Sequence, residues 1–142
     1  MMIGKIINPN ATRQVIALSG PPGIGKTAIC RAHEFASGIP LEFCNIGSCS
    51  DVEALKGSTS VWNGASAGIL AKSMTRMGCN NGTIVLDEID KINQGSHRSK
   101  GIYMTLLEVL DYSQNDKYED QFLSEIPIDL SHVTFMLSLI HI

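Results

Sequence analysis

The chain has 142 residues, a length that suits one compact domain rather than two. It is 44% hydrophobic and 18% charged, which excludes a disordered chain and is typical of a domain with a buried core. Eleven Lys and Arg against 14 Asp and Glu give a net charge of -3. Because the basic residues are scattered rather than clustered, nucleic acid is not an expected partner.

Targeting segments and metal-binding patterns are absent from the sequence. The N-terminus shows no apolar segment or cleavage site of a signal peptide, and apolar runs are far shorter than the roughly 20 residues of a membrane helix. We therefore expect an intracellular protein without a membrane partner. Cysteines stand at irregular spacings at Cys30, Cys44, Cys49 and Cys79. These spacings favour buried, reduced thiols over a disulfide framework or a zinc site.

Short apolar runs alternate with helical patterns along the chain. In chain order we expect a strand over 15–18, a helix over 26–36, a strand over 41–46, a short helix over 51–56 with Asp51 as its N-cap, a loop over 57–68, a helix over 69–77, a strand over 83–87, a loop over 93–100, a helix over 102–110, a turn-rich segment over 111–129 and a strand over 133–137. Strands that alternate with helices predict an α/β fold with a doubly wound parallel sheet.

The strongest motif follows the first predicted strand. It has the pattern G-x-x-x-x-G-K-T and comprises Gly20, Pro21, Pro22, Gly23, Ile24, Gly25, Lys26 and Thr27. Such a turn directs backbone N–H groups at phosphate oxygens, while the lysine reaches the β- and γ-phosphates and the threonine ligates Mg²⁺. The alternative is a glycine-rich turn with an exposed lysine. The position between a strand and a helix favours a nucleotide-binding loop.

A second motif ends the predicted strand over 83–87. Asp87 and Glu88 follow a buried apolar run, where acidic groups are costly unless they bind something. Beside a phosphate loop, Asp87 would hold Mg²⁺ through water and Glu88 would polarise the attacking water. The alternative is that both acids merely cap the next turn. The two motifs together predict an enzyme that hydrolyses a nucleoside triphosphate.

Trp62, the single tryptophan, lies in the Gly- and Ser-rich loop over 57–68. From composition alone, a lone tryptophan is more often a core or interface residue than a functional one.

Residues 20–27 and 86–91 resemble the two nucleotide motifs of AAA+ ATPases. Further segments narrow the resemblance to the ATPase module of the Lon family of ATP-dependent serine proteases. These are residues 51–57 (D-x-x-x-L-K-G), 62–65 (W-N-G-A), 106–111 (L-L-E-V-L-D), 114–115 (Q-N), 122–123 (F-L) and 129–135 (D-L-S-x-V-x-F). The resemblance extends from about residue 15 to residue 135.

This resemblance implies ATP with Mg²⁺ as ligands and a P-loop NTPase fold, the large AAA+ subdomain, working in a homo-hexamer. It implies that Trp62 and Asn63 belong to a pore loop that contacts unfolded or damaged protein substrates. It also implies ATP binding and hydrolysis that drive unfolding and translocation of protein substrates in a Lon-like protease. The alternative is a stand-alone AAA+ protein-remodelling ATPase without proteolytic activity. The compartment would be the cytoplasm or the mitochondrial matrix.

The chain also departs from the family pattern. Ile140 stands where the family has an asparagine sensor, and Tyr112 and Ser113 replace the Pro and Glu of its D-P-E-Q-N run. We therefore expect a partial AAA+ large subdomain over residues 1–137 and an aberrant tail over 138–142. The resemblance further implies that the last strand and the helical lid are missing and that the first strand is an exposed apolar edge prone to aggregation.

Overall fold

The computed structural model describes residues 15–59, 61, 63–92 and 97–140. Its elements in chain order are β1 (Ile16–Ser19), α2 (Lys26–Ser37), β2 (Leu41–Asn45), α3 (Val52–Lys56), α4 (Ile69–Met77), β3 (Thr83–Asp87), the 3₁₀ turn η1 (Ile89–Lys91), α5 (His97–Leu110), the 3₁₀ turn η2 (Asn115–Lys117) and β4 (Thr134–Leu139). The predicted order of strands and helices is confirmed.

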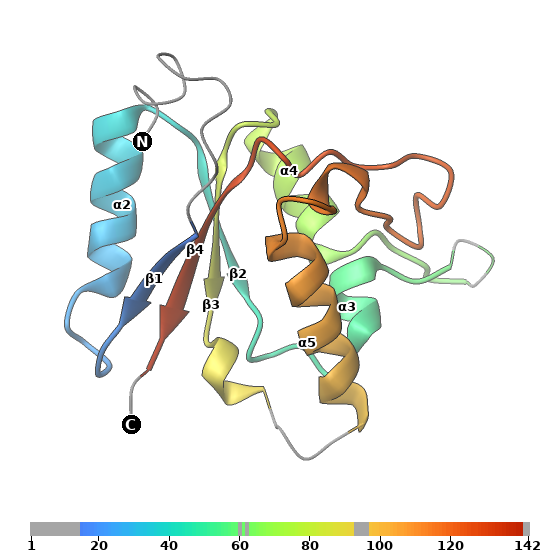
Figure 1. Ribbon diagram of the computed structural model, residues 1–142, viewed down its shortest axis with the longest axis horizontal. Helices are drawn as coiled ribbons and strands as arrows, with labels where there is room; N and C mark the ends of the chain where they lie inside the picture. The colour runs from blue at the N-terminus through green and yellow to red at the C-terminus, as the bar shows by residue number, and fades with distance from the viewer. Residues whose placement is uncertain (1–14, 60, 62, 93–96, 141–142) are drawn as a thin grey trace.

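The strands form one parallel sheet in the order β1-β4-β3-β2 (Figure 1). β3 lies between two neighbours, and its residues from Thr83 to Leu86 are buried, as expected for a β-rich apolar run in a parallel sheet. β1 pairs with β4 and forms one edge of the sheet. The predicted α/β class with a parallel sheet is therefore confirmed.

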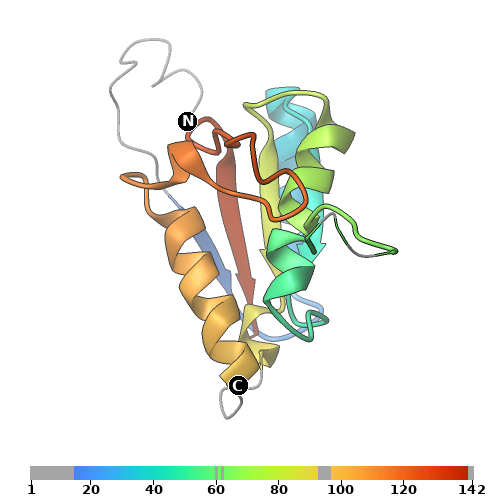
Figure 2. The same cartoon turned by 90° about the vertical axis from the view of Figure 1, so that its right-hand side faces the viewer.

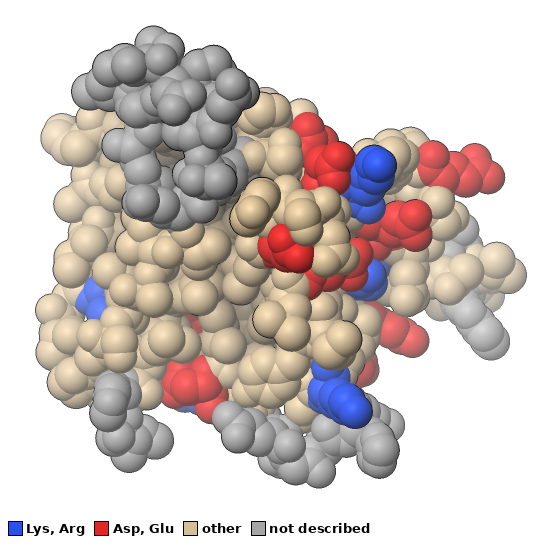
Figure 3. All heavy atoms as spheres, in the orientation of Figure 1, with Lys and Arg blue, Asp and Glu red and all other residues tan. Residues whose placement is uncertain are grey.

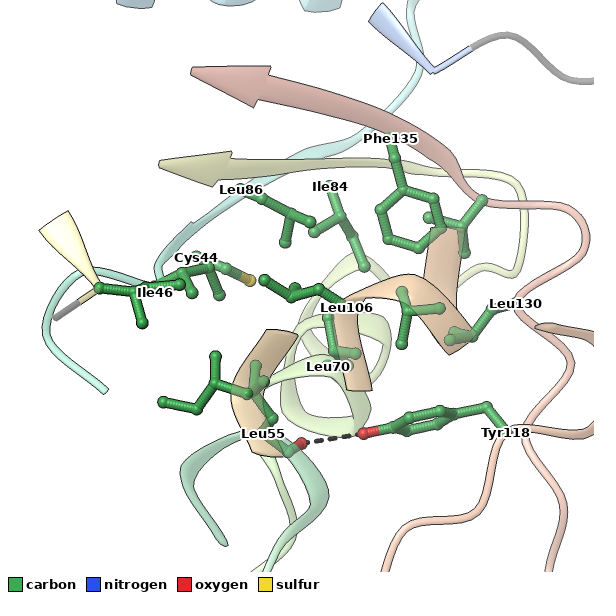
Figure 4. Packing of buried hydrophobic residues seen from close by; sticks show 14 residues of the cluster. Cys44, Ile46, Leu55, Leu70, Ile84, Leu86, Leu106, Tyr118, Leu130 and Phe135 are labelled. Atoms are coloured by element: carbon green, nitrogen blue, oxygen red, sulfur yellow. Dashed lines mark hydrogen bonds between the residues drawn. The ribbon is translucent and has the colours of Figure 1, made fainter. Parts of the chain in front are cut away.

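Helices cover both faces of the sheet, as Figures 1 and 2 show: α2 lies on one face, and α3, α4 and α5 lie on the other. Side chains of β3 alternate between these two layers because successive residues of a strand point to opposite faces. Val85 packs in the smaller core with Cys30 of α2, whereas Ile84 and Leu86 belong to the larger core beneath α3, α4 and α5. Figure 4 shows this larger core at close range.

Two boundaries differ from the sequence prediction by two residues or more. α5 begins at His97, so the predicted loop over 93–100 is wrong for residues 97–100, while residues 93–96 lie outside the described residues. Gly101 lies so close to α3 that an added Cβ would be 2.3 Å from Cγ2 of Val52. Tertiary packing of α5 on α3 thus stabilises a helical turn that polar residues and a glycine do not favour on their own. β4 continues two residues past the predicted strand, through Ser138 and Leu139.

The predicted cap of the short helix is confirmed. Oδ1 of Asp51 accepts a hydrogen bond from the backbone N–H of Ala54 (3.3 Å) at the start of α3.

Within the described residues, no helix has the length and apolar character needed to cross a membrane.

Charged side chains are unevenly distributed over the face of the molecule that Figure 3 draws. In Figure 3, acidic and basic side chains gather mainly on the right-hand half, whereas the half over α2 and β1 shows few. α2 exposes the apolar side chains of Ile29 (56% exposed) and Phe35 (92%), and Val15, just before β1, is 40% exposed. An edge strand beside exposed apolar groups is a site for pairing with other chains. Aggregation of the chain therefore stays a prediction.

Candidate active site

The carboxyl ends of the parallel strands meet at one edge of the sheet (Figure 1). Asp87 at the end of β3 lies opposite Asn45 of β2 on one side and Ser138 of β4 on the other. The phosphate loop leaves β1 at the same edge, where the N–H of Gly20 donates to the carbonyl oxygen of Leu139 (3.2 Å). The fold thus brings the two sequence motifs to the place where open α/β sheets bind ligands.

The phosphate loop, residues 20–27, forms the turn between β1 and α2. Gly25 has φ of 95°, a left-handed conformation that residues with a Cβ rarely adopt. The backbone N–H groups of Gly23, Ile24 and Thr27 donate to no acceptor within the described residues. Because unpaired N–H groups at a helix N-terminus attract anions, this turn fits the phosphates of a nucleotide.

Lys26 supplies the positive charge of the loop. Its Nζ donates to the carbonyl oxygens of Gly20 (2.7 Å) and Pro21 (3.0 Å), which holds the ammonium group above the turn. The next residue, Thr27, is exposed and offers a hydroxyl oxygen, one of the hard ligands that Mg²⁺ prefers. The remaining loop residues, Pro22 and Ile24, are also exposed. Residues 21–24 and Thr27 are therefore exposed at the start of α2, whereas Gly20 is buried.

Asp87, the last residue of β3, is half-buried. Its Oδ1 accepts a hydrogen bond from the N–H of Glu88 (3.0 Å). Burial and, next, the negative charge of Asp87 raise the pKa of the Cys30 thiol on α2. Val85, two residues earlier in β3, packs with Cys30, so this part of β3 lies beside the helix that begins with Lys26. A carboxylate and a threonine hydroxyl are oxygen ligands of the kind that Mg²⁺ prefers, and Thr27 and Asp87 as its ligands stay a prediction.

Glu88 is held by two neighbours. Its backbone has φ of 59°, and it is the one non-glycine residue with positive φ in the described part of the chain. Its carboxylate pairs with Nζ of Lys91 in η1 and accepts a hydrogen bond from Nδ2 of Asn45 (3.2 Å). The hydrogen bond from Lys91, and then that from Asn45, lower the pKa of Glu88 below its ordinary value. Glu88 is thus a carboxylate anion near neutral pH, as a base must be.

The sequence analysis missed Asn45 and Lys91 as parts of this site. Asn45 ends a predicted strand, and the parallel-sheet prediction already places strand ends at one edge, so its position contained a usable signal. Lys91 follows Glu88 by three residues, which puts both side chains on one side of a short turn.

The proposed substrate loop lies away from this edge. Trp62 is outside the described residues, so the prediction for its side chain is not examined by the structure. Asn63 is exposed in a turn between α3 and α4. Figure 1 shows this loop on the opposite side of the molecule from the phosphate loop. The structure therefore does not bring Asn63 together with the nucleotide motifs.

Ile140, at the predicted sensor position, directly follows β4. Its N–H donates to Oδ1 of Asp90 in η1 (3.2 Å), so its backbone lies near the end of β3. An aliphatic side chain has no hydrogen-bonding group for a phosphate or a water.

A parallel sheet with a phosphate loop after β1 and an acidic pair after β3 defines a P-loop nucleotide-hydrolysing domain. Residues 16–138 match the model of the ATPase family associated with various cellular activities (AAA), and the chain belongs to this family.

Curated relatives of the chain are Lon proteases. It is 36% identical over 139 residues to a Lon protease homolog of Acanthamoeba polyphaga mimivirus, with 96% of this chain and 14% of that protein covered. It is 40% identical over 135 residues to Lon protease 2 of Borreliella burgdorferi, with 92% and 16% covered. For the peroxisomal Lon protease homolog 2 of Pichia angusta the identity is 37% over 123 residues, with 86% and 13% covered. The chain thus spans about one-seventh of the length of these relatives, and its resemblance to Lon ATPase modules is confirmed.

Proposed function

We propose that the site binds ATP together with Mg²⁺ and hydrolyses it. The observation that carries this proposal is the meeting of an N–H-rich phosphate loop with Asp87 and Glu88 at one sheet edge. The N–H groups and Lys26 would hold the phosphates, while Thr27 and Asp87 would hold the metal ion, Asp87 through water. When bound, Mg²⁺ neutralises charge that develops on the phosphate oxygens.

Glu88 would accept a proton from the water that attacks the terminal phosphate. Its lowered pKa keeps it deprotonated, but the hydrogen bonds from Lys91 and Asn45 occupy its carboxylate in this structure. An ionised carboxylate can accept about four hydrogen bonds, so Glu88 can accept one from the water while Lys91 and Asn45 hold it in place.

We further propose that the chain acts within a homo-hexameric, intracellular Lon-like protease. The similarity to Lon proteases supports this assignment. In it, ATP hydrolysis would move the loop that contains Trp62 and Asn63 against an unfolded protein substrate. Relatives are named as mitochondrial and peroxisomal proteins, so the organelle is not set by family membership.

Binding of a fluorescent ATP analogue tests the proposed site. Asp87→Asn should weaken binding about tenfold in the presence of Mg²⁺, because replacing groups that orient metal ligands costs about 10- to 100-fold in metal affinity. With EDTA instead of Mg²⁺, the variant and the wild type should bind alike. Asp116→Asn, which removes an exposed carboxylate from η2, is the matched control and should behave as wild type. Wild-type affinity of Asp87→Asn in Mg²⁺ would contradict the assignment.

A further inference from the structure

Glu88 has a backbone conformation that residues with a side chain rarely adopt. Its φ of 59° and ψ of 33° lie in the left-handed region. Residues in this region are strained and persist only where the surrounding structure fixes them. The carbonyl oxygen of Glu88 accepts a hydrogen bond from the N–H of Lys91 (3.0 Å), which closes the turn η1 directly after it. This turn therefore depends on neighbours that leave room for it.

Gly47, two residues past the end of β2, lies directly against the turn. A Cβ added at position 47 would be 2.8 Å from Cβ of Glu88, 2.8 Å from its carbonyl oxygen and 3.1 Å from Cβ of Lys91. The two contacts at 2.8 Å are closer than van der Waals radii allow, and backbone and Cβ atoms cannot swing away as the end of a long side chain can. A side chain at position 47 would therefore displace the turn or its own backbone.

The backbone around Gly47 is fixed on both sides by hydrogen bonds. The N–H of Ile46 donates to the carbonyl oxygen of Asp87 (2.9 Å), and the N–H of Ser48 donates to Oδ1 of Asn45 (3.1 Å). Ile46 is also fully buried in the larger core. Because the segment after β2 is held in this way, the turn at Glu88 is the part that would have to move.

Glycine at position 47 is needed for space rather than for backbone freedom. Its φ lies outside the positive range, so other residues could adopt its backbone conformation. Gly25 of the phosphate loop differs in this respect, since its φ is 95°. The conflict that a side chain at position 47 would create is therefore a conflict with the turn that contains Glu88.

We propose that Gly47 is a positioning residue for Glu88. The space beside Gly47 allows Glu88 to keep the left-handed conformation in which its carboxylate pairs with Lys91 and accepts a hydrogen bond from Asn45. This inference rests on the proposed role of Glu88 as the base. A displacement of about 1 Å can cost about 100-fold in rate, so a small shift of the turn should slow hydrolysis.

NMR of the complete chain tests the conformation of Glu88 independently of activity. A positive φ brings the amide proton and Hα of one residue close together, so Glu88 should give a strong nuclear Overhauser effect between them. In Gly47→Ala this effect should fall to the level of residues with negative φ. Gly101→Ala is the matched control, because its methyl group would meet Val52 of α3 instead, and it should leave the effect at Glu88 unchanged. A weak effect in the wild type, or an unchanged one in Gly47→Ala, would overturn the proposal.

Hydrolysis of ATP tests the positioning role. Gly47→Ala should lower the rate of phosphate release about 10- to 100-fold and change the affinity for a fluorescent ATP analogue less than about threefold, because the base moves and the phosphate loop does not. Gly101→Ala should keep the wild-type rate. Equal rates in the two glycine variants would contradict the positioning role. A normal rate in Glu88→Gln would contradict the proposed base, while the Overhauser effect would still decide whether Gly47 sets the conformation of Glu88.

Thermal unfolding decides the case in which Gly47→Ala is unstable. Overpacking should lower the Tm of the wild type by about 3–9 °C. In Glu88→Gly the same change should lower Tm less than half as much, since this variant lacks the Cβ and accepts other backbone conformations. If Gly47→Ala alone does not fold, the double variant with Glu88→Gly should fold. Equal losses of Tm in both backgrounds, or a double variant that also fails to fold, would show that position 47 does not act through Glu88.

Discussion

The variant Lys26→Ala tests two roles of Lys26 separately. One is the stabilisation of the phosphate loop without ligand, and the other is the binding of ATP. In the structure Nζ of Lys26 donates to the carbonyl oxygens of Gly20 and Pro21 at 2.7 and 3.0 Å. These bonds are partly exposed to water, so their loss should lower the free energy of unfolding by no more than about 1 kcal/mol. ATP binds the folded state and not the unfolded state, so it also raises the free energy of unfolding. This increase is the larger of the two effects.

The size of the ATP effect follows from linkage. At a free ATP concentration about 100 times Kd, binding stabilises the folded state by about 2.7 kcal/mol. For 142 residues the entropy of unfolding is about 0.3 kcal/mol/K, so each kcal/mol moves Tm by about 3 °C. Saturating ATP with Mg²⁺ should therefore raise the Tm of the wild type by about 9 °C.

Lys26→Ala should lose nearly all of this increase. Removal of one partner of a charge pair in a binding site costs about 2–5 kcal/mol, which lowers affinity by more than about 30-fold. At the same ATP concentration the increase in Tm falls to about 3 °C or less, while Tm without ATP falls by about 3 °C at most.

Differential scanning fluorimetry with and without ATP measures both effects. Lys72→Ala is the matched control, since Lys72 also donates to one oxygen, Oγ of Ser66 (3.0 Å), at an exposed position away from the sheet edge. It should retain the full ATP-dependent increase. An equal increase in wild type and Lys26→Ala would refute the assignment of residues 20–27 as the nucleotide site.

Three further predictions follow from the site and the core. Glu88→Gln should lower the rate of phosphate release from ATP about 10²- to 10⁴-fold and change ATP affinity less than about threefold, because the amide keeps the shape but not the base; a normal rate would exclude Glu88 as the base. The pKa of Glu88, measured by carbon-13 NMR, should lie below the ordinary 4.5 in wild type and rise in Lys91→Met, which removes its ion-pair partner; an unchanged pKa would show that the pair does not form in solution. Leu86→Ala empties a fully buried position of β3 and should lower the free energy of unfolding by about 2–5 kcal/mol, measured by urea denaturation, with a loss below about 1 kcal/mol arguing against this core.

Most of the fold was predictable because its signals are local. A β-rich run such as residues 83–87 defines a buried strand by itself, and Asp51 marks the start of its helix through one nearby hydrogen bond. The start of α5 was predicted five residues late. The early start of α5 depends on the contact of Gly101 with Val52 of α3. The local sequence does not predict that two helices pack so closely.

The candidate site divides in the same way. The phosphate loop is one continuous segment of the sequence, and Asp87 and Glu88 are neighbours in another. Each of these two motifs is therefore recognisable without knowledge of the fold. Asn45 contacts Glu88 across 43 residues, and Gly47 lies against the same residue. Such contacts depend on register and packing, which a single sequence specifies only through the complete fold.

One close-packed core joins the nucleotide edge to α3 and α4. Leu86 directly precedes Asp87 in β3, Leu55 lies in α3 and Leu70 lies in α4; all three are buried in the same cluster (Figure 4). Protein interiors are packed at the density of organic crystals and are therefore hard to compress. A displacement of β3 at the nucleotide edge would accordingly reach α3 and α4 through direct side-chain contact, without a hinge in between.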